Sequence, residues 1–187
     1  MKGILKIIGA VAVINIIARL VGFARETYIA TAFGTTLYAD SIVNAYTIPN
    51  FLYLVIGGAF TTAFISVYHK TSSSITEYIR RTFTTIVITI TLVVILFMVL
   101  ANPILMQFFH VKDEAEYEIL QSLYFWMMPS TIMLVLSTWM SGILNVQGRY
   151  HLSAFSVLIY NGSFLIVSVI LSIMMGPIGM GIGALVG

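Results

Sequence analysis

The sequence predicts an all-α fold, a polytopic bundle of transmembrane helices. Of its 187 residues, 59% are hydrophobic and only 9% are charged, far from the balance of a soluble domain. Apolar runs such as TFTTIVITITLVVILFMVLANPILMQFF lie between charged clusters. Each is long enough for a helix to cross the hydrocarbon core, which takes about 20 residues. A transmembrane barrel would show short alternating segments instead.

Five complete helices and the start of a sixth are expected. Their approximate bounds are residues 4–30, 40–69, 82–109, 118–145, 153–175 and 178–187. Pro49 removes a backbone donor and is expected to break the second helix, which Gly57 and Gly58 should loosen further. These three positions and Gly22 in the first helix are candidate hinges. Because the last apolar run stops without charged or interfacial residues, we expect a fragment of a longer chain.

The basic residues predict the topology, because cytoplasmic loops retain Lys and Arg. Those near the expected helix ends are Lys2, Lys6, His69, Lys70, Arg80, Arg81 and Arg149. The segment HVKDEAEYE, between the third and fourth helices, is acidic and belongs outside. This alternation places the amino terminus in the cytoplasm.

Two arginines and an aspartate near the first helix need an explanation. Arg19 lies deep in the expected helix, where a charge costs roughly 2.5–3.5 kcal/mol on insertion scales. Arg19 either extends to the interface along its aliphatic stem, with Arg25 and Glu26 marking the interface, or faces a water-filled cavity where it binds an anion. A straight helix would aim them about 120° apart, unless Gly22 permits a bend. Asp40 is either the N-cap of the second helix or a cavity residue beside Arg19, and the two roles are compatible.

Composition excludes several classes of function. The sequence has no cysteine, which excludes disulfides and thiolate metal sites. Its three histidines fall in separate expected loops, so neither a shared metal site nor a Ser-His pair is expected. A net charge of +2 without a basic stripe argues against nucleic-acid binding. We expect a protein that is not an enzyme and that uses no metal or cofactor.

Three segments in order, RLVGFARE, FGTTLYADSIVNAYTIPNFL and GGAFTTAFISVY, resemble the opening of the MurJ (MviN) family of lipid II flippases. This family belongs to the multidrug, oligosaccharidyl-lipid and polysaccharide exporter superfamily. A later segment, GILNVQGRYHLSAFSVLIYN, is also similar to the family pattern. The resemblance extends over residues 19–161, which is most of the chain.

The resemblance implies the first lobe of a two-lobed, multi-pass transporter in the bacterial cytoplasmic membrane. Its substrate would be the undecaprenyl-diphosphate-linked peptidoglycan precursor. Arg19 and Arg25 match the two cavity arginines of the family's first helix, and Asp40 matches the acidic residue that opens the second. The implied partners are the lipid-linked precursor, membrane lipid and the missing carboxy-terminal lobe.

The chain departs from the family pattern after the IPN motif. Tyr53 and Leu54 stand near a usual basic pair, Gly57 replaces a usual glutamate, and Ser66 replaces a proline. These changes leave open a flippase for another polyprenyl-linked polysaccharide. They also leave open a drug or cation exporter of the superfamily, although cavity arginines argue against cation export. A non-transporting truncated membrane protein is a further hypothesis, from a different class.

Overall fold

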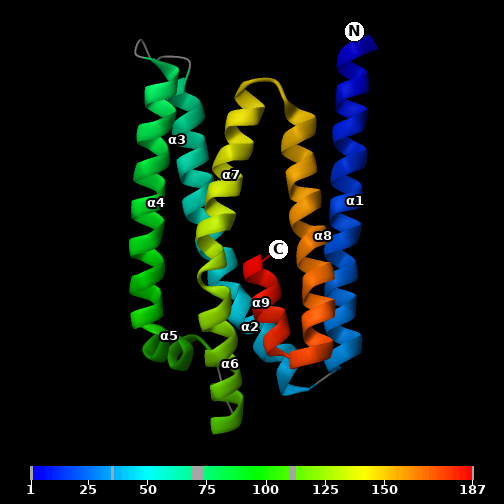
Figure 1. Cartoon of the computed structure of the whole chain (residues 1–187), viewed down its shortest axis with the longest axis vertical. Helices are drawn as coiled ribbons and strands as arrows, with labels where there is room; N and C mark the ends of the chain where they lie inside the picture. The colour runs from blue at the N-terminus through cyan, green and yellow to red at the C-terminus, as the bar shows by residue number, and fades with distance from the viewer. Residues whose placement is uncertain (1, 35, 69–73, 110–112, 187) are drawn as a thin grey trace.

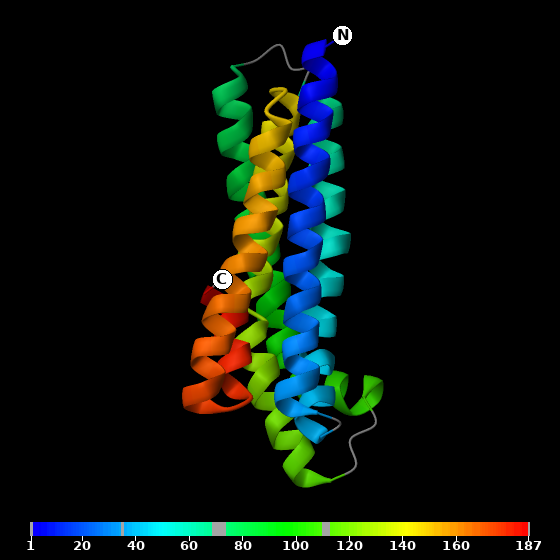
Figure 2. The same cartoon turned by 90° about the vertical axis from the view of Figure 1, so that its right-hand side faces the viewer.

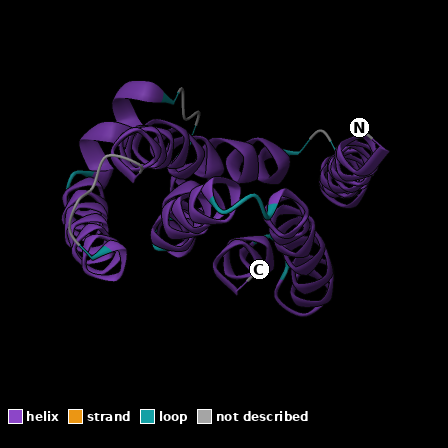
Figure 3. Cartoon of the chain, turned by 90° about the horizontal axis from the view of Figure 1, so that it is seen from above, coloured by secondary structure: helices purple, strands orange, loops and turns teal. Residues whose placement is uncertain are grey.

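The computed structural model describes residues 2–34, 36–68, 74–109 and 113–186, including their side chains except those of residues 2–6 and 37. These residues form helices and contain no strand (Figures 1 and 3). The elements are α1 Lys2–Phe33, α2 Leu37–Leu52, the π-helical turn η1 Tyr53–Gly57, α3 Gly58–Tyr68, α4 Ile75–Val99, α5 Ala101–Phe108, α6 Glu114–Met127, α7 Ser130–Val146, α8 Tyr150–Met175 and α9 Ile178–Val186.

Five segments of the described chain are long and apolar enough to cross a membrane. They are Ile7–Phe33, Tyr38–Tyr68, Ile75–Val99, Glu114–Val146 and Tyr150–Met175. After them, α9 begins a further apolar helix. These segments confirm the predicted fold class, an all-α transmembrane bundle with five complete helices and the start of a sixth.

Two helices begin at least four residues earlier than hydropathy suggested, because polar residues extend them beyond the apolar run. α4 begins at Ile75 rather than near residue 82. α6 begins at Glu114 rather than near residue 118, with Asp113 as its N-cap. The Asp113 side chain accepts a hydrogen bond of 2.8 Å from the backbone N–H of Glu116. Carboxylates at this position satisfy free backbone donors and suit the positive end of the helix dipole.

Two expected helices are interrupted by proline. Pro103 has no N–H to donate to the carbonyl of Val99, and α4 ends at Val99, before the short α5. Pro129 separates α6 from α7 in the same way. The expected helices at 82–109 and 118–145 are therefore each built from two pieces.

Pro49 does not break the second helix, contrary to the prediction. α2 continues through it to Leu52, and helical backbone angles continue across Tyr53 and Gly58. The irregularity lies one turn later, in η1. Proline is tolerated inside membrane helices because neighbouring groups and local adjustments of the backbone can satisfy the hydrogen-bonding groups that it frees.

The α6–α7 segment forms the centre of the bundle. Half of its most apolar window is buried, against 17% or less in the other four spans. Its side chains Tyr124, Met127, Val135 and Trp139 are at most 2% exposed and pack in one core with residues of α2, α3, α4 and α9. α1 lies at the periphery, where it packs chiefly against α8 (Figure 3).

Glycines bring α9 into direct contact with its neighbours. After the turn at Gly176, whose φ is 64°, α9 folds back between α8 and α6 (Figure 1). A Cβ at Gly179 would overlap the backbone of Leu171, and one at Gly183 would overlap Ser168. Small residues let membrane helices approach closely, and packing of this kind holds them together in a bilayer.

The two ends of the bundle differ in charge. Figures 1 and 2 show the start of α1, the end of α3, the start of α4 and the α7–α8 turn at one end, and the starts of α2 and α6 at the other. Arg80, Arg81 and Arg149 lie near the first end, and the acidic start of α6 lies at the second. His69 and Lys70 lie outside the described residues. The arrangement agrees with the predicted alternation, and the cytoplasmic location of the first end stays a prediction.

We expect single cysteines to report this topology in a cysteine-free background. Ala115 and Gln147 are exposed at opposite ends of the bundle. A membrane-impermeant maleimide should label Ala115→Cys in intact cells, but label Gln147→Cys only after the membrane is permeabilised, because basic loops stay in the cytoplasm. The reverse pattern would contradict the predicted orientation.

Candidate functional site

Arg25 carries its charge into the interior of the bundle. Its side chain is 14% exposed. The guanidinium carbon lies 4.7 Å from the ring centroid of Phe164 on α8 and 5.4 Å from that of Tyr46 on α2. Nη2 and Nε both donate to Oε1 of Glu26, over 2.6 and 3.2 Å. Arg25 thus connects three helices, and its Nη1 has no hydrogen-bond partner among the described residues.

Two cavities meet at Arg25. The first, of about 420 Å³, lies between α1 and α2, and its walls are mainly apolar; they include Ile29, Ile42, Val43, Phe51, Leu54 and Met127. The second, of about 400 Å³, lies among α2, η1, α7 and α8, and its walls carry many polar side chains; they include Ser137, Thr138, Ser141, Ser153, Tyr160 and Asn161. One cavity therefore suits apolar groups, and the other offers hydroxyls and amides.

Arg25, Tyr46 and Asn50 line both cavities and form the boundary between them. The first cavity is lined by Ile29 of α1 and Ile42 of α2, near the end of α1 and the start of α2. The second is lined by Ser141 of α7 and Ser153 of α8, near the turn that joins these two helices. An anion in either cavity would therefore meet the same guanidinium.

Three of the four positions that depart from the family pattern lie in or beside these cavities, and Ser66 lies elsewhere, exposed on α3. Tyr53 lines the second cavity and Leu54 lines the first. Gly57 packs against α7, where an added Cβ would lie 3.5 Å from Cβ of Thr138. As a result, Arg25 is the single basic residue that lines either cavity in the described part of the chain.

Arg19 lies in a different place. It is exposed and lines a groove of about 480 Å³ between α1 and α8, together with Asn15, Gly22 and Asn161. Because α1 is a continuous helix through Gly22, the two arginines point in different directions, as their spacing implies. The structure does not bring Arg19 and Arg25 together, although Asn161 lines both the groove and the second cavity.

Asp40 is exposed in the first turn of α2 and lines neither cavity. The N-cap of α2 is Thr36, so the N-cap interpretation of Asp40 is wrong, although its carboxylate still suits the helix dipole. Arg19 lies about 20 Å along α1 from the end where α2 begins. Within the described residues, no ion pair joins Asp40 to Arg19 or Arg25. A role for Asp40 in substrate binding stays a prediction.

The candidate hinges have different surroundings. A Cβ added at Gly57 would contact α7, whereas one added at Gly58 would have no neighbour within 4 Å. One added at Gly22 would lie 3.8 Å from Oδ1 of Asn161. Gly57 is therefore a close-packing position, and hinge motion at Gly22, Pro49, Gly57 and Gly58 stays a prediction.

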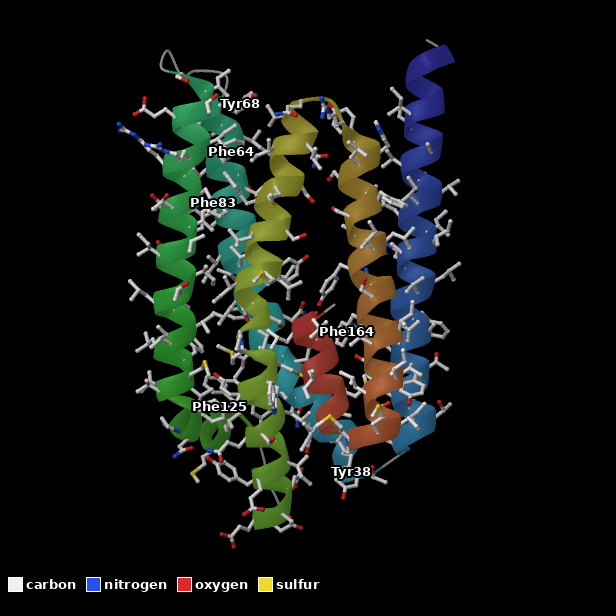
Figure 4. All side chains as sticks on the ribbon, in the orientation of Figure 1. Tyr38, Phe64, Tyr68, Phe83, Phe125 and Phe164 are labelled. Carbon is white, nitrogen blue, oxygen red and sulfur yellow. The ribbon has the colours of Figure 1, made fainter. Side chains whose placement is uncertain are left out.

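Sequence reasoning did not single out the aromatic residues beside Arg25. Phe164 is 3% exposed and lies on α8 in the interior of the bundle (Figure 4), and its ring centroid is 6.0 Å from those of Tyr46 and Tyr160. Aromatic residues in apolar helices are ordinarily core, so nothing in the sequence marked these three. Asn50 and Asn161 were visible as amides in apolar helices, but such amides most often serve packing.

The family model described as lipid II flippase MurJ matches residues 29–187, most of the chain. This chain belongs to the lipid II flippase MurJ family. Among the MurJ relatives, the probable lipid II flippase MurJ of Buchnera aphidicola subsp. Schizaphis graminum is 29% identical over 175 residues, which cover 88% of this chain and 34% of the relative. The lipid II flippase MurJ of Burkholderia cenocepacia is 28% identical over 165 residues, which cover 83% of this chain and 32% of the relative.

The fold is also that of a solved MurJ structure. The lipid II flippase MurJ in an inward closed conformation superposes with a TM-score of 0.75 at 23% identity, over 94% of this chain and 38% of the other. The chain thus spans about a third of the length of the MurJ relatives it matches. Membership of the MurJ family and five membrane-spanning segments make it a multi-pass protein of the bacterial cytoplasmic membrane.

Proposed function

We propose that the full-length protein is a flippase for lipid II, the undecaprenyl-diphosphate-linked peptidoglycan precursor, and that residues 1–187 form its amino-terminal lobe. The remainder of the protein supplies a second lobe, and the site binds and releases its cargo without chemical change. Membership of the MurJ family supports this proposal. The observation that carries it is the position of Arg25 at the meeting point of two cavities.

The chemistry of Arg25 suits a diphosphate. A guanidinium stays charged and presents planar, paired N–H donors that match phosphate oxygens. Glu26 occupies one edge of the Arg25 guanidinium, and Nη1 has no hydrogen-bond partner among the described residues. Hydroxyls in the second cavity, such as those of Ser137 and Ser141, suit the sugars and peptide of a glycan head group.

Transport would proceed by alternating access, as one lobe rocks against the other around the bound head group. The polyprenyl tail stays in the lipid. Moving one charge across the membrane is worth about 2.3 kcal/mol per 100 mV. Because the cytoplasm is electrically negative, this potential drives an anionic head group outward.

Rescue of cells depleted of their own lipid II flippase tests the proposal. The full-length wild-type protein should restore both growth and surface-exposed lipid II, whereas an empty vector should not. If the protein is made and inserted but lipid II does not reach the surface, lipid II is the wrong cargo. Surface exposure of another polyprenyl-linked glycan in the same cells would then support that glycan as the substrate.

A further inference from the structure

The rings of Tyr46 and Phe164 lie against the Arg25 guanidinium, and Tyr160 packs against both of them; we call these three side chains the aromatic cluster. Phe164 and Tyr46 lie 4.7 and 5.4 Å from the guanidinium carbon, measured to the ring centroids. The hydroxyls of Tyr46 and Tyr160 lie 3.4 Å apart, and the Phe164 centroid is 6.0 Å from both other rings. The cluster therefore links α2 to α8 next to the charge that α1 carries.

The ion pair alone cannot hold Arg25 at this place. Glu26 is the next residue on the same helix, so its contact leaves the position of the guanidinium relative to α2 and α8 undetermined. Its side chain is also 53% exposed, and exposed ion pairs contribute little. A ring face, by contrast, attracts a cation directionally, and more strongly where water is excluded. Phe164 is 3% exposed and meets this condition.

We propose that the aromatic cluster positions the Arg25 guanidinium at the boundary between the two cavities, so that one cation receives the anionic head group from either side. The proposal rests on the proposed function, since it deepens the role of the same site. Tyr46 is a positioning residue in two respects, because it contacts Arg25 and lines both cavities. Its ring, rather than its hydroxyl, carries the contact with the charge.

Binding of undecaprenyl diphosphate to the purified full-length protein in nanodiscs tests the proposal. Tyr46→Leu should weaken binding about tenfold, within the range for a desolvated cation–π contact, whereas Tyr46→Phe keeps the ring and should retain most of the affinity. Tyr78→Leu is the matched control, because Tyr78 stacks on Phe64 at 5.3 Å, away from Arg25. Inorganic diphosphate as a second probe separates recognition of the phosphates from recognition of the lipid.

A double-mutant cycle separates positioning from a general packing role. In an Arg25→Gln background, Tyr46→Leu should change the affinity less than about twofold, because the ring acts through the guanidinium. An equal loss with and without Arg25 would overturn the proposal, and so would a loss in Tyr46→Phe as large as that in Tyr46→Leu.

A second measurement does not depend on the cargo. With 4-fluorophenylalanine at position 164, the chemical shift of the ¹⁹F resonance should change in the Arg25→Gln variant. It should not change in the Arg81→Gln variant, because Arg81 pairs with Glu77 on α4. An unchanged ¹⁹F chemical shift in the Arg25→Gln variant would overturn the positioning role. If the resonance moves but undecaprenyl diphosphate does not bind the wild-type protein, the cluster holds Arg25 and the proposed function fails instead.

Discussion

Arg25→Ala in the full-length protein is expected to weaken binding of undecaprenyl diphosphate by about 10- to 100-fold and to abolish rescue of flippase-depleted cells. The physical reason is the loss of charged hydrogen bonds, each worth about 1.5–3 kcal/mol, at about 1.4 kcal/mol for each tenfold change. No other basic side chain lines either cavity in the described residues, so none of those residues can take over its charge. Titration of the purified protein and counts of surviving cells measure the two effects.

Three further variants make this prediction specific. Arg25→Lys keeps the charge without the planar donors and should bind with intermediate affinity. Arg81→Ala is the matched control, because that side chain is 77% exposed and pairs with Glu77. Arg19→Ala should have a smaller effect than Arg25→Ala, since Arg19 lies in the separate α1–α8 groove. A larger loss with Arg19→Ala would move the binding site away from Arg25.

Gly179→Ala should produce the largest loss of stability. The added Cβ would overlap the backbone of Leu171, and a backbone contact cannot be relieved by a change of rotamer. Overpacking of this kind typically costs about 1–3 kcal/mol. We therefore expect the midpoint of thermal unfolding of the purified full-length protein to fall by several degrees, with α9 displaced from α8.

Gly58→Ala is the matched control for this loss. A Cβ at Gly58 would meet nothing within 4 Å, and alanine is favoured over glycine inside a helix by about 1 kcal/mol. The midpoint of unfolding should therefore stay the same or rise. If Gly179→Ala is as stable as Gly58→Ala, the close contact between α8 and α9 is wrong. A stable Gly58→Ala protein that no longer transports would support a hinge at Gly58.

Most of the fold could be predicted because membrane helices are marked by composition. Long apolar runs and the absence of alternating strand patterns define the five spans, and neither signal depends on which helices pack together. The predictions that were wrong concern features that do not depend on apolar runs. The start of α6 depends on the Asp113 cap, and the path of the second helix depends on a π-helical turn after Pro49. Both features follow from local hydrogen bonding that hydropathy does not record.

The site could be predicted only in part. The cost of a charge in an apolar helix marked Arg19, whereas Arg25 was assigned to the cavity by resemblance to the family pattern. The angle between the two arginines follows from helix geometry. The rings around it were not visible, because Tyr46 and Phe164 lie 21 and 139 residues further along the chain and look like ordinary core residues. Which arginine faces the cavities depends on how α1 packs against α8, and that is a tertiary property.

Photocrosslinking tests most directly whether the head group sits at Arg25 between the two cavities. In the full-length protein in cells, benzoylphenylalanine replaces one residue at a time: Val43 in the first cavity or Ser137 in the second. The control position is Leu92, which lies on α4 and is 62% exposed. We predict lipid II crosslinks from positions 43 and 137 but not from 92, and their loss when Arg25→Ala is added. Equal crosslinking from position 92, or cavity crosslinks that survive Arg25→Ala, would contradict a head-group site at Arg25.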